Sequence, residues 1–265
     1  MFLHYLTAIL LGMIEGVTEF LPISSTGHLI LMIDILGFDK PKGAVFEVII
    51  QLGAILAICM VFRERVTDVV CNFHRSSSTR RFVGLILAAF TPAAILGFIW
   101  HDDIKQVLFS PMVVCVMLIV GGVLILLIER IKPQAHIHRA DDIPVKKAVM
   151  IGLCQALAMI PGTSRSGATM MGSVMMKIDR KTAAEFSFLL AIPTMAAAAM
   201  LDVIKNIDHL NVDDALTIGV GFLSAFFSAL LSVRWLLNFL ANHGFGIFAY
   251  YRIIMGTVLL ILMYG

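Results

Sequence analysis

The chain has 265 residues, of which 59% are hydrophobic and only 14% are charged. A soluble domain has roughly 45–50% apolar and about 25% charged residues, so this composition predicts that much of the surface faces lipid. A net charge of only +2 without long basic runs argues against a nucleic-acid-binding surface, and the four scattered cysteines lack metal-ligand spacing.

The first apolar region, residues 5–36, is interrupted by a polar segment at residues 21–28 that contains proline and glycine. Each apolar arm has roughly 10–16 residues, fewer than the about 20 that a helix needs to cross the hydrocarbon. Broken helices at this depth are tolerated only where the freed backbone is buried in protein or lines a wet cavity. We therefore expect a re-entrant helical hairpin here, and a second one over residues 146–176, which are interrupted at residues 160–167.

Five or six further apolar stretches are long enough to cross the membrane as helices. They lie near residues 44–62, 82–100, 112–130, 183–203, 214–238 and 247–264. The predicted fold is an all-α integral membrane protein with about six spanning helices and two re-entrant hairpins. The first residues lack a basic segment and a cleavage site, so we expect them to belong to the membrane domain and not to a signal peptide.

The two halves of the chain look duplicated. The Pro-x-x-Ser pattern of residues 22–25 recurs at residues 161–164, an offset of 139. Within one membrane domain, residues 1–265, we interpret residues 1–131 as a first repeat and residues 146–265 as a second. Each repeat would hold one hairpin and three spanning helices, so the second enters the membrane upside down. Two inverted hairpins can then meet near the midplane, as in many transporters.

The basic residues predict the orientation. On this topology 14 of the 20 Lys and Arg residues lie in the loops on one side and four lie in those on the other. The remaining two, Arg165 and Arg252, lie within membrane segments. An excess of basic residues marks the cytoplasmic side, so we expect both termini and the first hairpin to face outward.

The hairpins contain ionisable side chains, which are costly inside apolar segments and usually face a partner or a wet cavity. Glu15 and Glu19 are four residues apart and would share one helix face. Arg165 lies in the second hairpin, where its planar guanidinium suits phosphate oxygens. The alternative is a structural salt bridge of Arg165 with Glu15 or Glu19, which does not exclude the functional role.

Hydroxyl groups and a histidine follow the proline of the first hairpin. Ser24 or Thr26 could simply cap the next helix. A helix N-terminus also binds anions, because its free N–H groups and its dipole favour a phosphate. His28 is a plausible proton carrier beside two carboxylates and hydroxyls.

Together, these residue types favour phosphoryl transfer, in which cations and N–H groups hold the phosphate and a base activates the attacking group. Two glutamates beside a diphosphate also suit Mg²⁺, which takes one or two carboxylates and substrate phosphates. We further expect Glu47, Gln51 and Glu185 to line the same cavity, with Gln155 as another hydrogen-bonding partner. Arg252 is expected to pair with one of these residues.

Two motifs carry a family resemblance. Residues 15–28 (EGVTEFLPISSTGH) and 161–169 (PGTSRSGAT) closely resemble the signature motifs of the undecaprenyl-diphosphate phosphatases associated with bacitracin resistance. Residues 46–57 and 185–193 resemble further segments of that family. The resemblance implies hydrolysis of undecaprenyl diphosphate to the monophosphate, which recycles the lipid carrier for cell-wall synthesis and lowers bacitracin sensitivity. It also implies a divalent cation, Mg²⁺ or Ca²⁺.

The resemblance assigns roles position by position. It implies that Glu15 and Glu19 are the acidic pair and the metal ligands, Ser25 the candidate nucleophile, His28 the proton carrier and Arg165 the phosphate clamp. The residues that would assist phosphate binding are Ser24, Thr26, Ser164 and Ser166. Attack by a water molecule in place of Ser25 stays open.

The expected partners are undecaprenyl diphosphate and membrane lipid, with nucleic acid excluded and a homodimer left open. The expected location is the bacterial cytoplasmic (inner) membrane, with the active site opening to the outer side. A transporter of the lipid phosphate is the competing class, because inverted repeats with broken helices are also transporter architecture. The density of phosphate-handling groups favours the enzyme.

Overall fold

The computed structural model describes residues 2–38, 45–108, 110–131, 134–206 and 215–264. The helices are α1 (Phe2–Thr18), α2 (Ser25–Leu36), α3 (Val45–Val61), α4 (Arg63–Asn72), α5 (Ser77–Leu108), α6 (Pro111–Ile131), α7 (Val145–Ala156), α8 (Arg165–Met175), α9 (Arg180–Asn206), α10 (Ala215–Leu240) and α11 (Gly246–Tyr264). Two short 3-10 turns cover Ala140–Asp142 and Leu157–Met159. Within these ranges β-structure is limited to one isolated bridge, so the all-α prediction is confirmed.

Five helices, α5, α6, α9, α10 and α11, are long and apolar enough to cross a membrane. The pair α3 and α4 passes the same test together but is bent by 82° at a short break, which allows a sixth span. The prediction of five or six spans is therefore confirmed. The predicted bounds at residues 44 and 214 lie outside the described residues.

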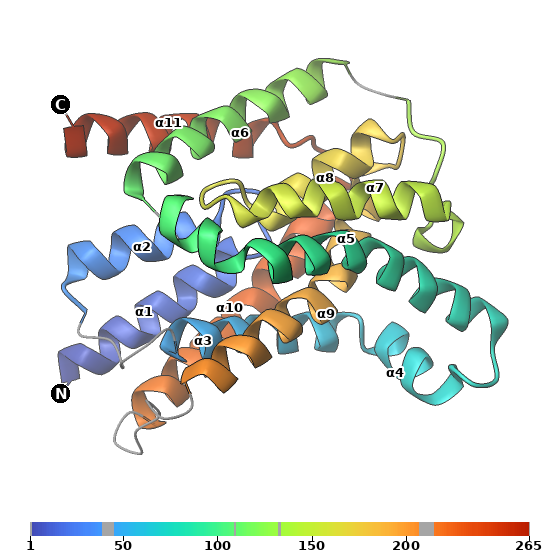
Figure 1. Cartoon of the computed structure of the whole chain (residues 1–265), viewed down its shortest axis with the longest axis horizontal. Helices are drawn as coiled ribbons and strands as arrows, with labels where there is room; N and C mark the ends of the chain where they lie inside the picture. The colour runs from blue at the N-terminus through green and yellow to red at the C-terminus, as the bar shows by residue number, and fades with distance from the viewer. Residues whose placement is uncertain (1, 39–44, 109, 132–133, 207–214, 265) are drawn as a thin grey trace.

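The two interrupted regions each form a pair of short helices, α1 with α2 and α7 with α8. These helices have 17, 12, 12 and 11 residues. At 1.5 Å per residue they are about 16–26 Å long, shorter than the roughly 30 Å of hydrocarbon. The arms of each pair pack against each other. Both chain termini lie at one end of the molecule, whereas the start of α5 and the end of α6 lie at the opposite end (Figure 1).

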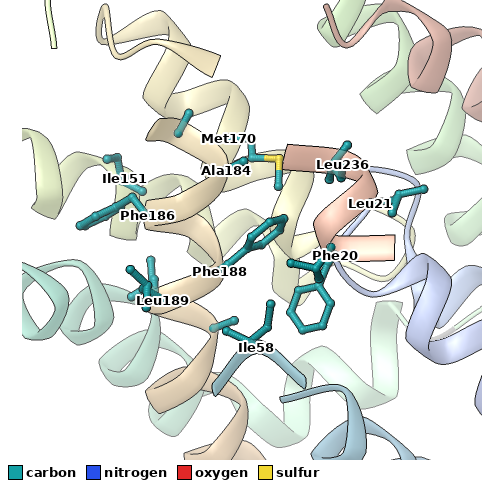
Figure 2. Close-up of a cluster of buried hydrophobic side chains, with 14 of the residues drawn as sticks. Phe20, Leu21, Ile58, Ile151, Met170, Ala184, Phe186, Phe188, Leu189 and Leu236 are labelled. Carbon is teal, nitrogen blue, oxygen red and sulfur yellow. The ribbon is translucent and has the colours of Figure 1, made fainter. Parts of the chain in front are cut away.

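A buried apolar cluster ties the first helix break to the second half of the chain. Phe20, from the turn after α1, lies beside Phe188 of α9, and Leu21 lies near Leu236 of α10 (Figure 2). The rings of Phe20 and Phe188 meet edge to face with centroids 5.4 Å apart. The position of the first turn is therefore set by tight packing against α9.

Helix α10 packs closely against α1 and α3 because glycines face its backbone. A Cβ atom on Gly12 would lie 2.3 Å from the carbonyl oxygen of Gly221, and one on Gly53 would lie 2.5 Å from that of Phe222. Small residues allow membrane helices to approach in this way. The contact holds α1, which carries Glu15, against the centre of the bundle.

We predict that Gly12→Ala lowers the free energy of unfolding by about 1–3 kcal/mol, because a backbone carbonyl cannot move aside for the added methyl group. Gly219→Ala is the matched control, since a Cβ atom on this α10 glycine would meet no atom within 4 Å. Unfolding of both variants in mixed detergent micelles checks the prediction. Equal stability of the two would contradict the described contact between α1 and α10.

Candidate active site

Each helix pair changes direction at a serine with an unusual backbone. Ser24 precedes α2 with a φ of 70°, and Ser164 precedes α8 with a φ of 72°. Residues other than glycine rarely adopt this left-handed region, and such positions concentrate at functional sites. Ser164 also caps α8, because its hydroxyl accepts a hydrogen bond of 3.1 Å from the backbone N–H of Gly167.

The two turns are in direct contact. The hydroxyl of Ser166 donates to the backbone carbonyl of Leu21 over 2.9 Å, although the two residues are 145 positions apart. A cavity of about 190 Å³, the hairpin cavity, lies beside this contact. Its polar lining residues are Glu19, Ser24, Ser25, Thr26, Gln51, Ser164, Arg165 and Thr194.

Glu19 connects Ser25 to Arg165. One carboxylate oxygen accepts a hydrogen bond from Nη2 of Arg165 at 2.9 Å, and the other accepts from the hydroxyl of Ser25. The salt bridge considered as an alternative is therefore present, within the cavity lining. A nucleophilic hydroxyl in contact with a carboxylate is the arrangement that general-base activation requires. Arg165 is held further by the carbonyl oxygen of Ser187, 3.2 Å from Nη1.

Glu15 lies behind Glu19. Glu19 sits one residue beyond the end of α1, but its backbone N–H still reaches the carbonyl of Glu15 at 2.9 Å, which preserves the predicted shared face. Glu15 is 1% exposed. Its Oε1 atom is buried without a hydrogen-bond partner. Glu15 is not among the residues that line the hairpin cavity.

The described residues include no group of three or more His, Cys, Asp or Glu side chains that could hold a metal ion. Glu15 and Glu19 are the two carboxylates expected from the sequence to hold a cation. This set fits Mg²⁺ when substrate phosphate oxygens and water complete the shell, and the unpartnered oxygen of Glu15 is a free ligand atom.

His28 is not among the residues that line the hairpin cavity. Its Nδ1 lies 2.7 Å from the carbonyl oxygen of Ser24, and its Nε2 lies 2.6 Å from the hydroxyl of Tyr251. A carbonyl oxygen can only accept, so Nδ1 carries the hydrogen and Nε2 accepts from the tyrosine. Both ring nitrogens are thus engaged, and a role of His28 as proton carrier stays a prediction.

Ser166 is also placed behind the cavity. It is 0% exposed, and its hydroxyl lies 3.1 Å from that of Ser164 in addition to its bond with Leu21. It is not among the lining residues, whereas Ser24, Thr26 and Ser164 are. In this structure Ser166 joins the two turns, and its predicted contact with phosphate stays untested.

The further polar residues behave differently from one another. Gln51 lines the hairpin cavity as predicted, whereas Glu47 and Glu185 do not, and Glu185 lies 4.0 Å from Lys181. The prediction that Arg252 pairs with one of these side chains, or with Gln155, was wrong.

Instead, Arg252 donates only to backbone carbonyls among its described hydrogen bonds. The reason is physical: the two helix breaks leave carbonyl oxygens free, and a buried guanidinium can satisfy them. Sequence reasoning also missed Tyr251, because an aromatic residue in an apolar helix carries no signal of a distant partner.

A mostly apolar cavity of about 520 Å³ adjoins the hairpin cavity. Its walls come from α5, the end of α7 with the following turn, and α9. The two cavities share the lining residues Ala158, Arg165, Thr194 and Ala198. One arginine therefore faces both a polar and an apolar compartment.

The buried pair predicts strong coupling between Glu19 and Arg165. Each single change to Ala should lower the free energy of unfolding by about 3 kcal/mol, because it leaves a poorly solvated charge without its partner. The double variant should lose at least about 1 kcal/mol less than the sum of the two. Unfolding in mixed detergent micelles measures all three.

Lys181→Ala is the control, since its more exposed pair with Glu185 should contribute under about 1 kcal/mol. Additive single effects would contradict the described ion pair.

Comparison with known proteins places the chain in a family. Residues 8–258 match the family described as "Bacitracin resistance protein BacA". The protein named undecaprenyl-diphosphatase of Nitrosospira multiformis is 51% identical over 260 residues, which cover 98% of this chain and 95% of that protein. The undecaprenyl-diphosphatase of Parvibaculum lavamentivorans is 48% identical over 258 residues, which cover 97% of this chain and 96% of that protein. The one of Acinetobacter baumannii AYE is 49% identical over 258 residues, which cover 96% of this chain and 94% of that protein. The chain belongs to the bacitracin resistance protein BacA family.

Proposed function

We propose that this protein hydrolyses undecaprenyl diphosphate to undecaprenyl phosphate and inorganic phosphate. The reaction would recycle the lipid carrier for cell-wall synthesis and confer bacitracin resistance. Membership of the family and the name of the relatives support this activity. The observation that carries it is the Ser25–Glu19–Arg165 constellation at the wall of the hairpin cavity.

The proposed phosphate site uses the second arms of both hairpins. The guanidinium of Arg165 and the free N–H groups at the starts of α2 and α8 hold the diphosphate. Ser24, Thr26 and Ser164 add hydroxyl groups from the cavity wall. Arg165 pairs with Glu19 before substrate arrives. When the phosphate binds Arg165 in place of Glu19, the carboxylate is free to act as a base.

Glu19 then accepts the proton of the group that attacks. The hydroxyl oxygen of Ser25, or a water molecule in its place, forms a bond to the terminal phosphorus. The bond from that phosphorus to the bridging oxygen breaks, and undecaprenyl phosphate leaves with that oxygen. On the serine route, Glu19 gives this proton to the departing phosphate oxygen and then deprotonates a water molecule, which attacks the phosphoserine. The bond from phosphorus to the Ser25 oxygen breaks, inorganic phosphate leaves, and Glu19 returns the proton to the Ser25 oxygen.

A divalent cation, Mg²⁺ or Ca²⁺, is part of the proposal. Glu15 and Glu19 are the residues that would hold it, supported by the unpartnered buried oxygen of Glu15. When bound, it supplies positive charge that offsets the negative charge of the diphosphate.

The lipid tail would leave the phosphate site through the adjoining apolar cavity. Phe90, Ala94 and Gly97 of α5 line it on one side, and Ala197 and Leu201 of α9 line it on the other. Such a cavity suits the first isoprenoid units, because their burial removes apolar surface from water. A phosphate site next to an apolar cavity would favour this substrate over soluble diphosphates, because these carry no apolar tail.

The multi-pass fold supports a location in the bacterial cytoplasmic membrane. We propose that the hairpin cavity opens to the outer side, since most basic residues lie in the loops of the other side. The shared backbone conformation of Ser24 and Ser164 supports the repeat of residues 1–131 in residues 146–265. By backbone conformation Ser24 corresponds to Ser164, which is an offset of 140 residues. The Pro-x-x-Ser pattern gives an offset of 139 residues.

The purified protein should release phosphate from undecaprenyl diphosphate, and EDTA should abolish the release until Mg²⁺ or Ca²⁺ is restored. Arg165→Ala should reduce the rate by at least about 100-fold, because a transition-state contact is lost. Arg234→Ala, which changes an exposed arginine of α10, is the control and should keep the wild-type rate. A folded wild-type protein that releases no phosphate would contradict the proposal and favour a transporter. In the same assay, a near-normal rate of Ser25→Ala would exclude the serine route and leave attack by water.

A larger side chain in the apolar cavity should weaken substrate binding. For Ala94→Phe we expect KM for undecaprenyl diphosphate to rise roughly 10-fold with little change in kcat, since tail binding contributes equally to ground and transition states. Ile95→Phe is the matched control, because Ile95 is the neighbouring residue of α5 and is exposed outside the cavity. Steady-state kinetics of both variants decide the point. An unchanged KM in Ala94→Phe would place the tail elsewhere.

A further inference from the structure

Arg252 on α11 is a buried cation that binds the backbone at both helix breaks. It is 1% exposed. An arginine has five N–H groups, and five hydrogen bonds of 2.9–3.3 Å leave this side chain. The acceptors are the carbonyl oxygens of Pro22, Met117, Leu118, Gly162 and Thr163. One side chain therefore holds the first turn, the second turn and α6 together.

The contact with α6 depends on a glycine. A Cβ atom on Gly121 would lie 2.1 Å from Nη2 of Arg252 and 2.6 Å from its Cζ. The guanidinium thus occupies the space that any other residue at position 121 would fill. This observation is independent of the hydrogen bonds, and it indicates a seat on α6 that is shaped for the arginine.

The preceding residue of α11 supports the first turn by a second route. The hydroxyl of Tyr251 donates to Nε2 of His28, and Nδ1 of His28 donates to the carbonyl of Ser24. The two rings are nearly parallel, at 4°. Tyr251 and Arg252 thus act on the same turn, at carbonyl groups two residues apart.

These bonds determine where the opposite ends of two peptide groups point. In a planar trans peptide the C=O and N–H bonds are directed oppositely. The carbonyl of Thr163 points to Arg252, so the N–H of Ser164 points away from it. The carbonyl of Ser24 points to His28, so the N–H of Ser25 points away from that ring. Ser25 and Ser164 both line the hairpin cavity.

We propose that Arg252 and Tyr251 are positioning residues that orient the N–H groups of Ser164 and Ser25 as an anion hole for the diphosphate. Arg252 acts directly on both turns, and Tyr251 acts on the first turn through His28. Neither side chain touches the substrate. The inference rests on the proposed phosphatase function for its catalytic part, but the orientation of the two turns can be tested without catalysis.

Steady-state kinetics test the catalytic part. Tyr251→Phe removes one hydroxyl and should lower kcat roughly 10-fold while KM changes less than about 3-fold, because a small misplacement of catalytic groups affects mainly the transition state. Tyr250→Phe is the matched control, since the adjacent Tyr250 is 60% exposed. Arg252→Lys keeps the charge but offers only three donors, and should lose roughly 100-fold in kcat. Wild-type kcat in Tyr251→Phe or Arg252→Lys would overturn the proposal.

Hydrogen exchange of the backbone tests the orientation independently of activity. Tyr251→Phe should speed exchange of the amides in residues 22–30 and leave residues 161–170 unchanged, whereas Arg252→Lys should speed exchange in both. Gly121→Ala, which displaces the guanidinium, should reproduce the pattern of Arg252→Lys. Uniform changes throughout the chain, or none in either segment, would overturn the positioning role. If the wild-type protein releases no phosphate, the proposed function fails, and this exchange pattern still decides the present inference.

Discussion

Helices that end inside a membrane leave backbone groups that water cannot satisfy, and this constraint organises the structure. Both α1 and α7 stop too early to span the hydrocarbon, so the turns that follow must find partners within the protein. The carbonyl groups of the turns are satisfied by Arg252 and by His28. In our proposal, the N–H groups of Ser25 and Ser164 face the hairpin cavity. Because Arg252 satisfies carbonyl groups of the two breaks, N–H groups of the same turns are left to bind an anion.

The same constraint explains the charges of the site. A buried carboxylate is costly alone, and Glu19 is stabilised by Arg165 and Ser25 at once. This pairing offsets the charges of Glu19 and Arg165 without substrate, while each partner retains a chemical use. Arg165 also borders the apolar cavity, so its charge lies where a lipid tail would end and a phosphate begin. The guanidinium of Arg165 thus lies at the boundary between the polar and the apolar part of the proposed substrate site.

Several features could be predicted from the residues alone because they depend on short stretches of chain. The length of each apolar run indicates whether a helix can span, and Pro22 and Pro161 mark the breaks. The spacing of Glu15 and Glu19 determines their common face within one helical turn. The unusual residues of the two motifs likewise identified the family, since each motif is continuous in the chain.

Other features were decided only by the packing of distant segments. The partner of Arg165 is 146 residues away, and the tyrosine that binds His28 is 223 residues away. The sequence left open which carboxylate would pair with Arg165, and it assigned Arg252 to the wrong kind of acceptor. Backbone carbonyls carry no side-chain signature, so nothing in the order of residues marks them as ligands. These carbonyl groups bind Arg252 because the tertiary structure brings the two helix breaks and a glycine of α6 around its guanidinium.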